Sequence, residues 1–510
     1  MDTDLPFIPP DRLTPEICHT WAQDLQILGK LAEAETFYRA AIDLDPDRPR
    51  SWANLGLTVL RDGRIEEAIQ CEREALRIDP TYVEAHNNLG IALHTMGALA
   101  EAGNHFRGAL RLDPDHASAT LNLGVVRQTL GDVPGAEDLY RRALTLGCDG
   151  ARVHNNLALA LAELGRLEEA EQACRDSLAD QPGYPEASVN LAMILLMRGK
   201  LAEAWPLYES RWRVAPLSRT PRPPDDALWT GQQEVAGRTI LLLAEQGFGD
   251  TLQFCRYAPI LAAAGAKIIL AVPSPLVALM RSLDGVRNVI GEDDPVPPYD
   301  LHCPMLSLPG GFGTTLDNIP NRVPYLSADA AAVAAMEDLL PARRDARGPR
   351  IGLVWAGGRR PGEALAMAID KKRSMTLADL APIAAVPECV FVSLQVGPPA
   401  RQAEASTFPL IDLTGRLSNF ADTAALIQTL DLVISVDTAV AHLAAAMGKP
   451  VWLLNRFDAC WRWLPGLGAP DRSGTPWYPT MRLFRQTEPG DWASVVRRVA
   501  EALPGFQTVS

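Results

Sequence analysis

The feature that most constrains the fold is a step of 34 residues that repeats through the first part of the chain. Two small-residue positions recur six times at this step. They are Gly29, Gly63, Gly97, Gly131, Gly165 and Gly199, and Ala34, Ala68, Ala102, Ala136, Ala170 and Ala204. This period is typical of stacked helix pairs, each with an apolar stripe that it cannot cover alone. Residues 1–212, which end in WPLYESRW, are therefore predicted to form an α-solenoid.

The residues inside each repeat resemble the tetratricopeptide repeat (TPR). SWANLG (51–56), HNNLG (86–90) and LNLG (121–124) are similar to its first-helix signature. Four aromatic residues match the second-helix position, namely Tyr38, Phe106, Tyr140 and Tyr208. The resemblance implies a superhelical fold but says little about a reaction.

A second pattern runs through the same repeats. Five asparagines share the 34-residue step, namely Asn54, Asn88, Asn122, Asn156 and Asn190. They fall on the first helix of each pair, which lines the concave face of such solenoids. Helix propensity does not explain them, because asparagine is a mediocre helix former. One interpretation is a structural hydrogen bond within each repeat. The other is a ladder of amides that pairs with the backbone of an extended peptide; it resembles the asparagine ladder of the eukaryotic O-linked N-acetylglucosamine transferase.

Beyond a proline-rich connector over 213–237, strands and helices alternate. Apolar runs such as TILLLA (239–244) and RIGLVWAGG (350–358) indicate buried parallel strands. Two doubly wound, Rossmann-like halves are predicted, over 238–345 on the acceptor side and 346–510 on the nucleotide-sugar side. This is the layout of a GT-B glycosyltransferase, whose cleft binds both substrates, and other architectures with two Rossmann-like halves show the same pattern.

The stretch DLVISVDTAVAHLAAAMGKPVWLL, residues 431–454, predicts a strand, a tight turn, a helix and a second strand. Asp437 and Thr438 are helix N-cap residue types, and Ala439 begins the helix. Thr438 and His442 are four residues apart and share one helix face. The turn follows a parallel strand, where a helix N-terminus favours a phosphate. The alternative is that Asp437 only caps the helix and His442 is a satisfied surface residue.

Two further segments carry candidate site residues. In the turn EQGFGD, Gly247 and Gly249 precede Asp250, which could act as a general base or cap a helix that starts at Thr251. The segment after Gly357 and Gly358 keeps a basic cluster of Lys371, Lys372 and Arg373. This cluster could neutralise a departing diphosphate, with Lys372 and Gly357 on the donor side. The alternative is a solvated loop.

Composition limits the partners and the compartment. The formal net charge of -14 argues against nucleic acid as a partner. The eight cysteines are scattered without a CxxC pair, as in reduced cytoplasmic proteins without a zinc site. The N-terminus is acidic and unlike a signal peptide, and no apolar run reaches the length of a membrane helix. A cytoplasmic protein without a membrane span is expected.

The segments GFGDTLQFCRY, SVDTAVAHLAAAMGKPVW, WRWL and PWYPTMRLFRQ resemble bacterial TPR-containing glycosyltransferases with a heptosyltransferase-like catalytic region. That family includes enzymes of flagellin glycosylation. The resemblance implies that Asp437, Thr438 and His442 contact the donor's phosphates and that Asp250 is the base. Ala439 stands where many heptosyltransferases have glycine. Gly358 stands where an asparagine is common.

The leading hypothesis is a protein O-glycosyltransferase that needs no metal or other cofactor. It would move a sugar from a nucleotide-sugar to Ser or Thr of a protein held by the TPR groove, and flagellin is one candidate acceptor. Two alternatives are a transferase acting on a glycan or lipid-linked acceptor and a non-catalytic TPR scaffold. N-acetylglucosamine, a heptose and a nonulosonic acid all stay open as the sugar. His302 is expected to pack. Base stacking and core packing both stay open for Trp461, Arg462, Trp463, Trp477 and Tyr478.

Overall fold

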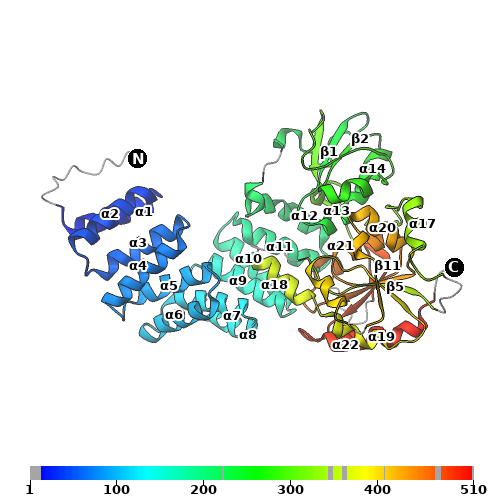
Figure 1. Cartoon of the computed structure of the whole chain (residues 1–510). Helices are drawn as coiled ribbons and strands as arrows, with labels where there is room; N and C mark the ends of the chain where they lie inside the picture. Colours follow the sequence, from blue (N-terminus) through cyan, green and yellow to red (C-terminus); the bar gives the residue numbers. More distant parts are fainter. Residues whose placement is uncertain are drawn as a thin grey trace. The chain divides into compact units, whose positions relative to one another are not determined.

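The structure is a computed structural model that describes residues 13–220, 223–342, 348–358, 364–406, 408–465 and 473–507. The chain divides into two compact units, Met1–Asn190 and Leu191–Ser510 (Figure 1).

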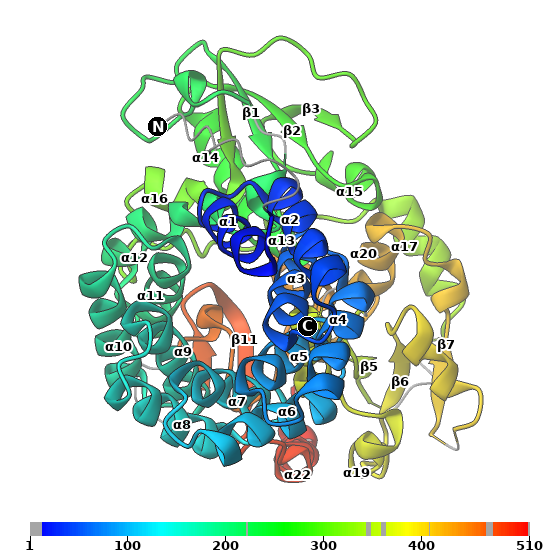
Figure 2. The same ribbon diagram turned by 90° about the vertical axis from the view of Figure 1, so that its left-hand side faces the viewer.

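The first unit is a solenoid of antiparallel helix pairs that follow one another from α1 to α10 (Figure 2). Its helices are α1 (Pro15–Ile27), α2 (Leu31–Leu44), α3 (Pro49–Arg61), α4 (Ile65–Ile78), α5 (Val83–Thr95), α6 (Leu99–Leu112), α7 (Ala117–Thr129), α8 (Val133–Thr145), α9 (Gly150–Glu163), α10 (Leu167–Asp180) and the start of α11 (Pro185–Met197). The repeating glycines lie in the turns between paired helices, with φ from 74° at Gly199 to 93° at Gly131. This left-handed conformation favours glycine.

The signature residues form the core between repeats. Tyr38, Phe106 and Tyr140 are fully buried. A Cβ on Gly90 would lie 2.6 Å from the Phe106 ring, so the first-helix glycine makes room for the aromatic side chain. In the second repeat Glu72 takes the aromatic place, and burial raises the pKa of its carboxyl group well above the ordinary value.

The second unit contains two sheets, one fully parallel and one with six parallel strands and an antiparallel edge strand, β10. The first has the order β3-β2-β1-β4. Its elements are β1 (Thr239–Leu243), α13 (Phe248–Phe254), α14 (Ala258–Ala263), β2 (Lys267–Ala271), α15 (Val277–Met280), β3 (Val286–Ile290), β4 (Leu301–Pro304) and α16 (Leu308–Gly311).

The second sheet has the order β10-β11-β9-β8-β5-β6-β7. Its six parallel strands, numbered along the chain from β5, lie in the order 3-2-1-4-5-6 of a dinucleotide-binding fold. Its elements are α17 (Ala330–Glu337), β5 (Arg350–Val354), α18 (Ala364–Arg373), α19 (Ala381–Ala384), β6 (Val390–Ser393), β7 (Leu410–Asp412), α20 (Phe420–Gln428), β8 (Leu432–Val436), α21 (Ala439–Ala446), β9 (Val451–Asn455), β10 (Gly474–Thr475), β11 (Tyr478–Arg485) and α22 (Trp492–Ala502). The predicted solenoid followed by two Rossmann-like halves is confirmed.

The helix expected over 251–264 differs from the prediction. α13 begins three residues earlier, at Phe248, and a 3-10 turn over Cys255–Tyr257 separates it from α14. Pro259 lies in the first turn of α14 and lacks the N–H that a continuous helix would need.

The last TPR helices pack in the second unit. α12 (Leu201–Tyr208) and the 3-10 helix η2 (Glu209–Arg213) follow α11. The indole of Trp205 donates a hydrogen bond to Thr314 O at 2.8 Å. The connector then runs along β4, where Trp229 N donates to His302 O at 2.8 Å. His302 is fully buried, as expected, with Nε2 2.8 Å from Pro224 O.

Candidate functional site

The turn after β8 leaves a helix N-terminus open. β8 is fully buried, and Thr438 is the N-cap residue of α21. The Thr438 side chain makes no capping hydrogen bond; its Oγ1 lies 3.1 Å from Ser435 Oγ. The first turn of α21 holds no acidic residue. Within the described part of the chain, no hydrogen bond satisfies the N–H groups of Ala439 and Val440. This helix end can therefore accept an anion.

His442 lies one turn into α21 and is buried, at 5% exposed. Its Nδ1 lies 2.9 Å from the Tyr478 hydroxyl, and its ring stacks on Trp463 at 5.3 Å between centroids. Burial, with smaller contributions from Arg462 and Arg256, lowers the pKa of His442 to about 3. The alternative interpretation of His442 as a surface residue is wrong, because α21 packs between the two halves.

Asp437 precedes the N-cap and does not cap the helix. Its Oδ2 accepts a hydrogen bond from Trp463 Nε1 at 2.9 Å. Its Oδ1 lies 3.9 Å from His442 Nε2, too far for a hydrogen bond but close enough for electrostatic interaction. The structure therefore orients this carboxylate beside the imidazole.

The basic cluster reaches the same turn through Arg373. Arg373 Nη1 donates to Asp437 O at 3.0 Å, and its Nε and Nη2 donate to Asp370. Lys372 instead pairs with Asp458, just after β9, at 3.0 Å. A Cβ on Gly357 would lie 2.0 Å from Asp370 Oδ1, so glycine there leaves room for the Arg373–Asp370 pair.

The turn after β1 supplies its own anion. Gly247 is the N-cap residue of α13, and Asp250 Oδ2 accepts its backbone N–H at 2.8 Å. Asp250 Oδ1 forms an ion pair with Arg462 of the other half. Asp250 is thus the third residue of α13 and not the cap of a helix starting at Thr251. Both of its oxygens are engaged.

The two turns meet at Gly249. A Cβ there would lie 3.0 Å from His442 Cδ2 and 3.8 Å from Ala439 Cα. The missing side chain lets the start of α13 approach the start of α21. The structure therefore brings Asp250, Gly249, Ala439 and His442 into one site, with Thr438 and Asp437 at its edge.

The turn after β1 is clamped from the other side. Glu245 is buried and forms a bidentate pair with Arg211, at 2.8 and 3.1 Å, and accepts Leu306 N at 3.1 Å. Burial raises the pKa of Glu245, and Arg211 opposes this shift. Gln246 adopts φ 62°, and its amide donates to the Tyr208 hydroxyl at 3.2 Å. The Arg211 clamp, formed by Tyr208, Arg211, Glu245 and Gln246, fixes the start of the turn.

The aromatic residues left open by the sequence lie in the core of the junction between the two halves. Trp461, Trp463, Trp477 and Tyr478 are fully buried. Arg256 donates to Trp477 O at 2.7 Å and to the Tyr325 hydroxyl at 2.9 Å. No role was predicted from the sequence for Arg256, Gln253 or Tyr325. Gln253 and Arg256 lie in the segment GFGDTLQFCRY, but only tertiary packing shows what they contact.

Three of the five ladder asparagines bond between neighbouring repeats. Asn54 Nδ2 lies 3.1 Å from His19 Nε2. Asn122 donates to Asn87 at 3.0 Å, and Asn190 donates to Asn155 at 2.8 Å. Each partner lies on the first helix of the preceding repeat. We call Asn54, Asn122 and Asn190 the tied asparagines.

For the other two ladder asparagines, Asn88 and Asn156, the residue 35 positions earlier is apolar, and Asn88 instead interacts with the Glu72 side chain of the preceding repeat. The apolar residue is Ala53 for Asn88 and Leu121 for Asn156. Neither Ala53 nor Leu121 has a side chain that can accept a hydrogen bond. The bonds seen thus connect repeats, whereas the structural interpretation had placed them within each repeat.

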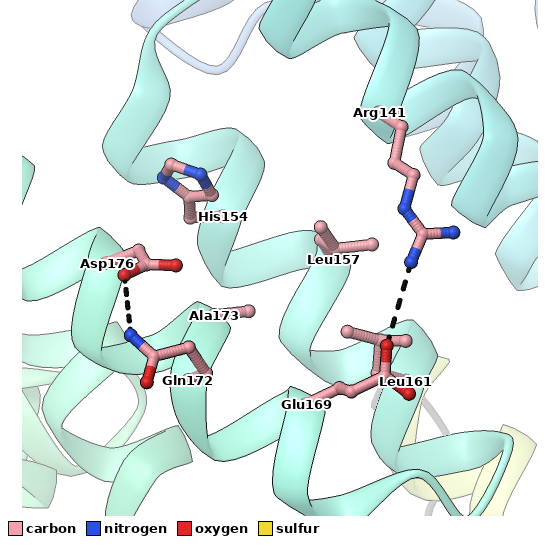
Figure 3. A pocket seen from close by; sticks show the side chains of 8 residues that line it. All are labelled: Arg141, His154, Leu157, Leu161, Glu169, Gln172, Ala173 and Asp176. Atoms are coloured by element: carbon pink, nitrogen blue, oxygen red, sulfur yellow. Dashed lines mark hydrogen bonds and ion pairs between the residues drawn. The ribbon is translucent and has the colours of Figure 1, made fainter.

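The same solenoid holds a surface pocket of about 230 Å³ between α8, α9 and α10 (Figure 3). Leu157, Leu161 and Ala173 form its apolar part. Around them lie Gln172, which donates to Asp176 at 2.8 Å, and Arg141, which lies 3.9 Å from Glu169. None of the five ladder asparagines lines this pocket.

Comparison with known families supports both regions. Tetratricopeptide repeat families match residues 17–48, 60–97, 88–150, 121–185 and 155–215. Glycosyltransferase family 9 (heptosyltransferase) matches residues 399–454, which contain the turn after β8 but not Asp250. No helix in the described residues is long and apolar enough to cross a membrane.

Similar proteins cover parts of the chain. Protein FlbA of Caulobacter vibrioides is 29% identical over 340 residues, 60% of this chain and 52% of that protein. The chain thus spans about half the length of this relative. A thermophilic TPR protein of Thermus thermophilus is 25% identical, with a TM-score of 0.33 over 36% of this chain and 99% of its own. Pseudomonas aeruginosa pilF is 19% identical, with a TM-score of 0.35 over 40% of this chain and 92% of its own. The chain joins a TPR array to a heptosyltransferase-like glycosyltransferase region, as the sequence predicted.

Proposed function

We propose that the protein is an O-glycosyltransferase that moves a sugar from a nucleotide-sugar donor to Ser or Thr of a protein acceptor. The donor diphosphate binds at the N-terminus of α21, and the TPR array binds the acceptor, for which flagellin is a candidate. The reaction takes place in the cytoplasm and needs no metal.

The open N-terminus of α21 is the observation that supports a donor site here. It lies at the carboxyl edge of a 3-2-1-4-5-6 sheet, next to the point where the strand order reverses between β5 and β8. Ala439 and Val440 offer backbone N–H groups, and the guanidinium of Arg373, which is also paired with Asp370, lies beside them. Phosphate groups favour this combination of free N–H groups, helix dipole and cation.

The acceptor side rests on the solenoid and the turn after β1. TPR arrays are protein-interaction modules, and the asparagines Asn54, Asn88, Asn122, Asn156 and Asn190 can offer amides to an extended peptide. Asp250 is the proposed base for the acceptor hydroxyl. For it to act, one of its oxygens must be released from Gly247 or Arg462.

Calorimetry with a panel of nucleotide-sugars tests the donor site. His442→Ala should weaken donor binding by roughly one to two decades, since hydrogen bonds to charged groups contribute about 1.5–3 kcal/mol. Asp437→Ala should weaken it indirectly, because this carboxylate orients the His442 imidazole. Asp329→Ala is the control, because Asp329 caps α17 away from this edge and should affect only stability. Unchanged donor affinity in both folded site variants would exclude the assignment.

Mass spectrometry of candidate acceptors, incubated with the chain and a bound donor, tests the acceptor class. Sugar on Ser or Thr of a protein such as flagellin supports the proposal. Sugar found only on a glycan or lipid would show that the acceptor is not a protein. If the chain neither transfers sugar nor binds a donor, the result would indicate a scaffold.

A further inference from the structure

We propose that Tyr478 holds the imidazole of His442 as the Nε2–H tautomer. The ring then presents an N–H donor at the start of α21. This inference rests on the proposed donor site for its role in binding, but the tautomer itself is a property of the chain without donor.

The hydrogen bonds around Tyr478 allow it to donate. Next to it, the Tyr325 hydroxyl donates to Leu252 O at 2.8 Å and accepts from Arg256 Nη2 at 2.9 Å. The guanidinium of Arg256 lies over the Tyr478 ring, 4.5 Å from its centroid. The hydroxyl of Tyr478 is 2.9 Å from His442 Nδ1, and Arg256, as a donor, and Tyr325 also interact with this hydroxyl. Donation to Nδ1 satisfies both groups.

The charge on the other side of the ring selects the same tautomer. Asp437 Oδ1 lies 3.9 Å from His442 Nε2. Trp463 donates to Asp437 Oδ2 and holds the carboxylate in this position. A proton on Nε2 faces the carboxylate favourably, whereas a lone pair there would face a negative charge. A hydrogen bond at one ring nitrogen and a carboxylate near the other therefore fix the tautomer together.

The ring stays neutral and faces the junction. Burial keeps the pKa of His442 near 3, so the imidazole carries one proton at neutral pH. Its Nε2 is 3.6 Å from the position of a Cβ on Gly249. Nε2–H therefore points to the side of the ring where the two helix N-termini meet. A neutral donor there can bind an oxygen of a diphosphate without the cost of burying a second cation.

The test is nitrogen NMR of the full chain with 15N-labelled histidine, with the His442 signals assigned from a His442→Gln variant. Wild type should show a protonated Nε2 and an unprotonated Nδ1. Tyr478→Phe should change this pattern toward a mixture of tautomers. Tyr257→Phe is the matched control, because the Tyr257 hydroxyl is buried against Thr314 at 2.8 Å and does not contact the ring. A protonated Nδ1 in wild type, or an unchanged pattern in Tyr478→Phe, would overturn the inference.

Donor calorimetry adds a readout that a purely structural role would not move. Tyr478→Phe should weaken binding about 2- to 12-fold, the equivalent of one neutral hydrogen bond. In a His442→Ala background it should have no further effect. If His442→Ala leaves donor affinity unchanged, the proposed donor site fails while the tautomer result stands. An equal loss in both backgrounds would show that Tyr478 acts independently of His442.

Discussion

The turns after β1 and β8 have the same local architecture but hold their acidic residues at different places, Asp250 inside the first turn of α13 and Asp437 before the N-cap of α21. Each follows a parallel strand and begins a helix, α13 or α21, and the two meet at Gly249. The first turn carries Asp250, which accepts a backbone N–H and pairs with Arg462. The second has no acid in its first helical turn, and Thr438 makes no capping bond. An acid inside the first helical turn disfavours a second anion there, whereas the start of α21, where Asp437 precedes the N-cap and is bound by Trp463, can accept one.

The solenoid repeats this contrast with neutral groups. The tied asparagines donate to the preceding repeat, whereas Leu121 gives Asn156 no acceptor at the equivalent place. The five asparagines that share the 34-residue step therefore have different structural roles. Contacts, and not the pattern, distinguish a polar group used by the fold from one left for a partner.

The largest effect is expected at Asp250. Asp250→Asn should slow sugar transfer on the order of 100-fold or more if the carboxylate is the base. It should also lower the melting temperature, because Arg462 loses its partner. Arg462→Gln breaks the same ion pair and keeps the carboxylate. It should therefore lose stability but retain most transfer activity, measured at saturating donor. Equal loss of transfer in both variants would show that the ion pair matters and that Asp250 is not the base.

A smaller effect is expected when α21 receives an anion of its own. Ala439→Asp should weaken donor binding about 5- to 30-fold, since an anion at a partly buried helix N-terminus is worth about 1–2 kcal/mol. Ala439→Asn has nearly the same size without the charge and should bind donor more tightly than Ala439→Asp. Calorimetry on both variants checks this. Equal affinities would mean that size, and not charge, decides what this turn accepts.

The smallest effect is expected in the solenoid. Asn122→Ala removes a bond between repeats and should cost about 0.5–1.5 kcal/mol of the free energy of unfolding. Asn156→Ala removes no such bond and should leave thermal unfolding nearly unchanged. Acceptor-protein affinity, measured on the same two variants, shows whether either amide also contacts the acceptor. A larger stability loss in Asn156→Ala would contradict the division into tied and other asparagines.

Much of this architecture could be predicted because it depends on local periodicity. The step of the glycines and alanines fixes the helix pairs, since the turn between paired helices needs positive φ. The run from Asp431 to Leu454 predicted β8, α21 and β9 because a buried strand, cap residues and a glycine stop follow one another. His442 was also placed correctly at the start of α21 by its spacing from Thr438.

The missed features depend on contacts between distant segments. Nothing near Asp250 in the sequence indicates Arg462, which is 212 residues away. The prediction chose Lys372 from a cluster of three basic residues, whereas Arg373 reaches the turn through a bond to a backbone oxygen. The burial of His442 and its bond to Tyr478 likewise depend on how the halves pack. Spacing cannot reveal which side of a helix a second domain covers.

The Arg211 clamp limits where the TPR array can be replaced by a different repeat array. Tyr208 and Arg211 belong by repeat register to the TPR array, but they hold the turn that carries the proposed base. Trp205 adds a bond to Thr314. A foreign array joined at residue 212 would remove all three side chains from the transferase. A seam near Asn190 would keep them, so the interchangeable part of the array ends before the last repeat.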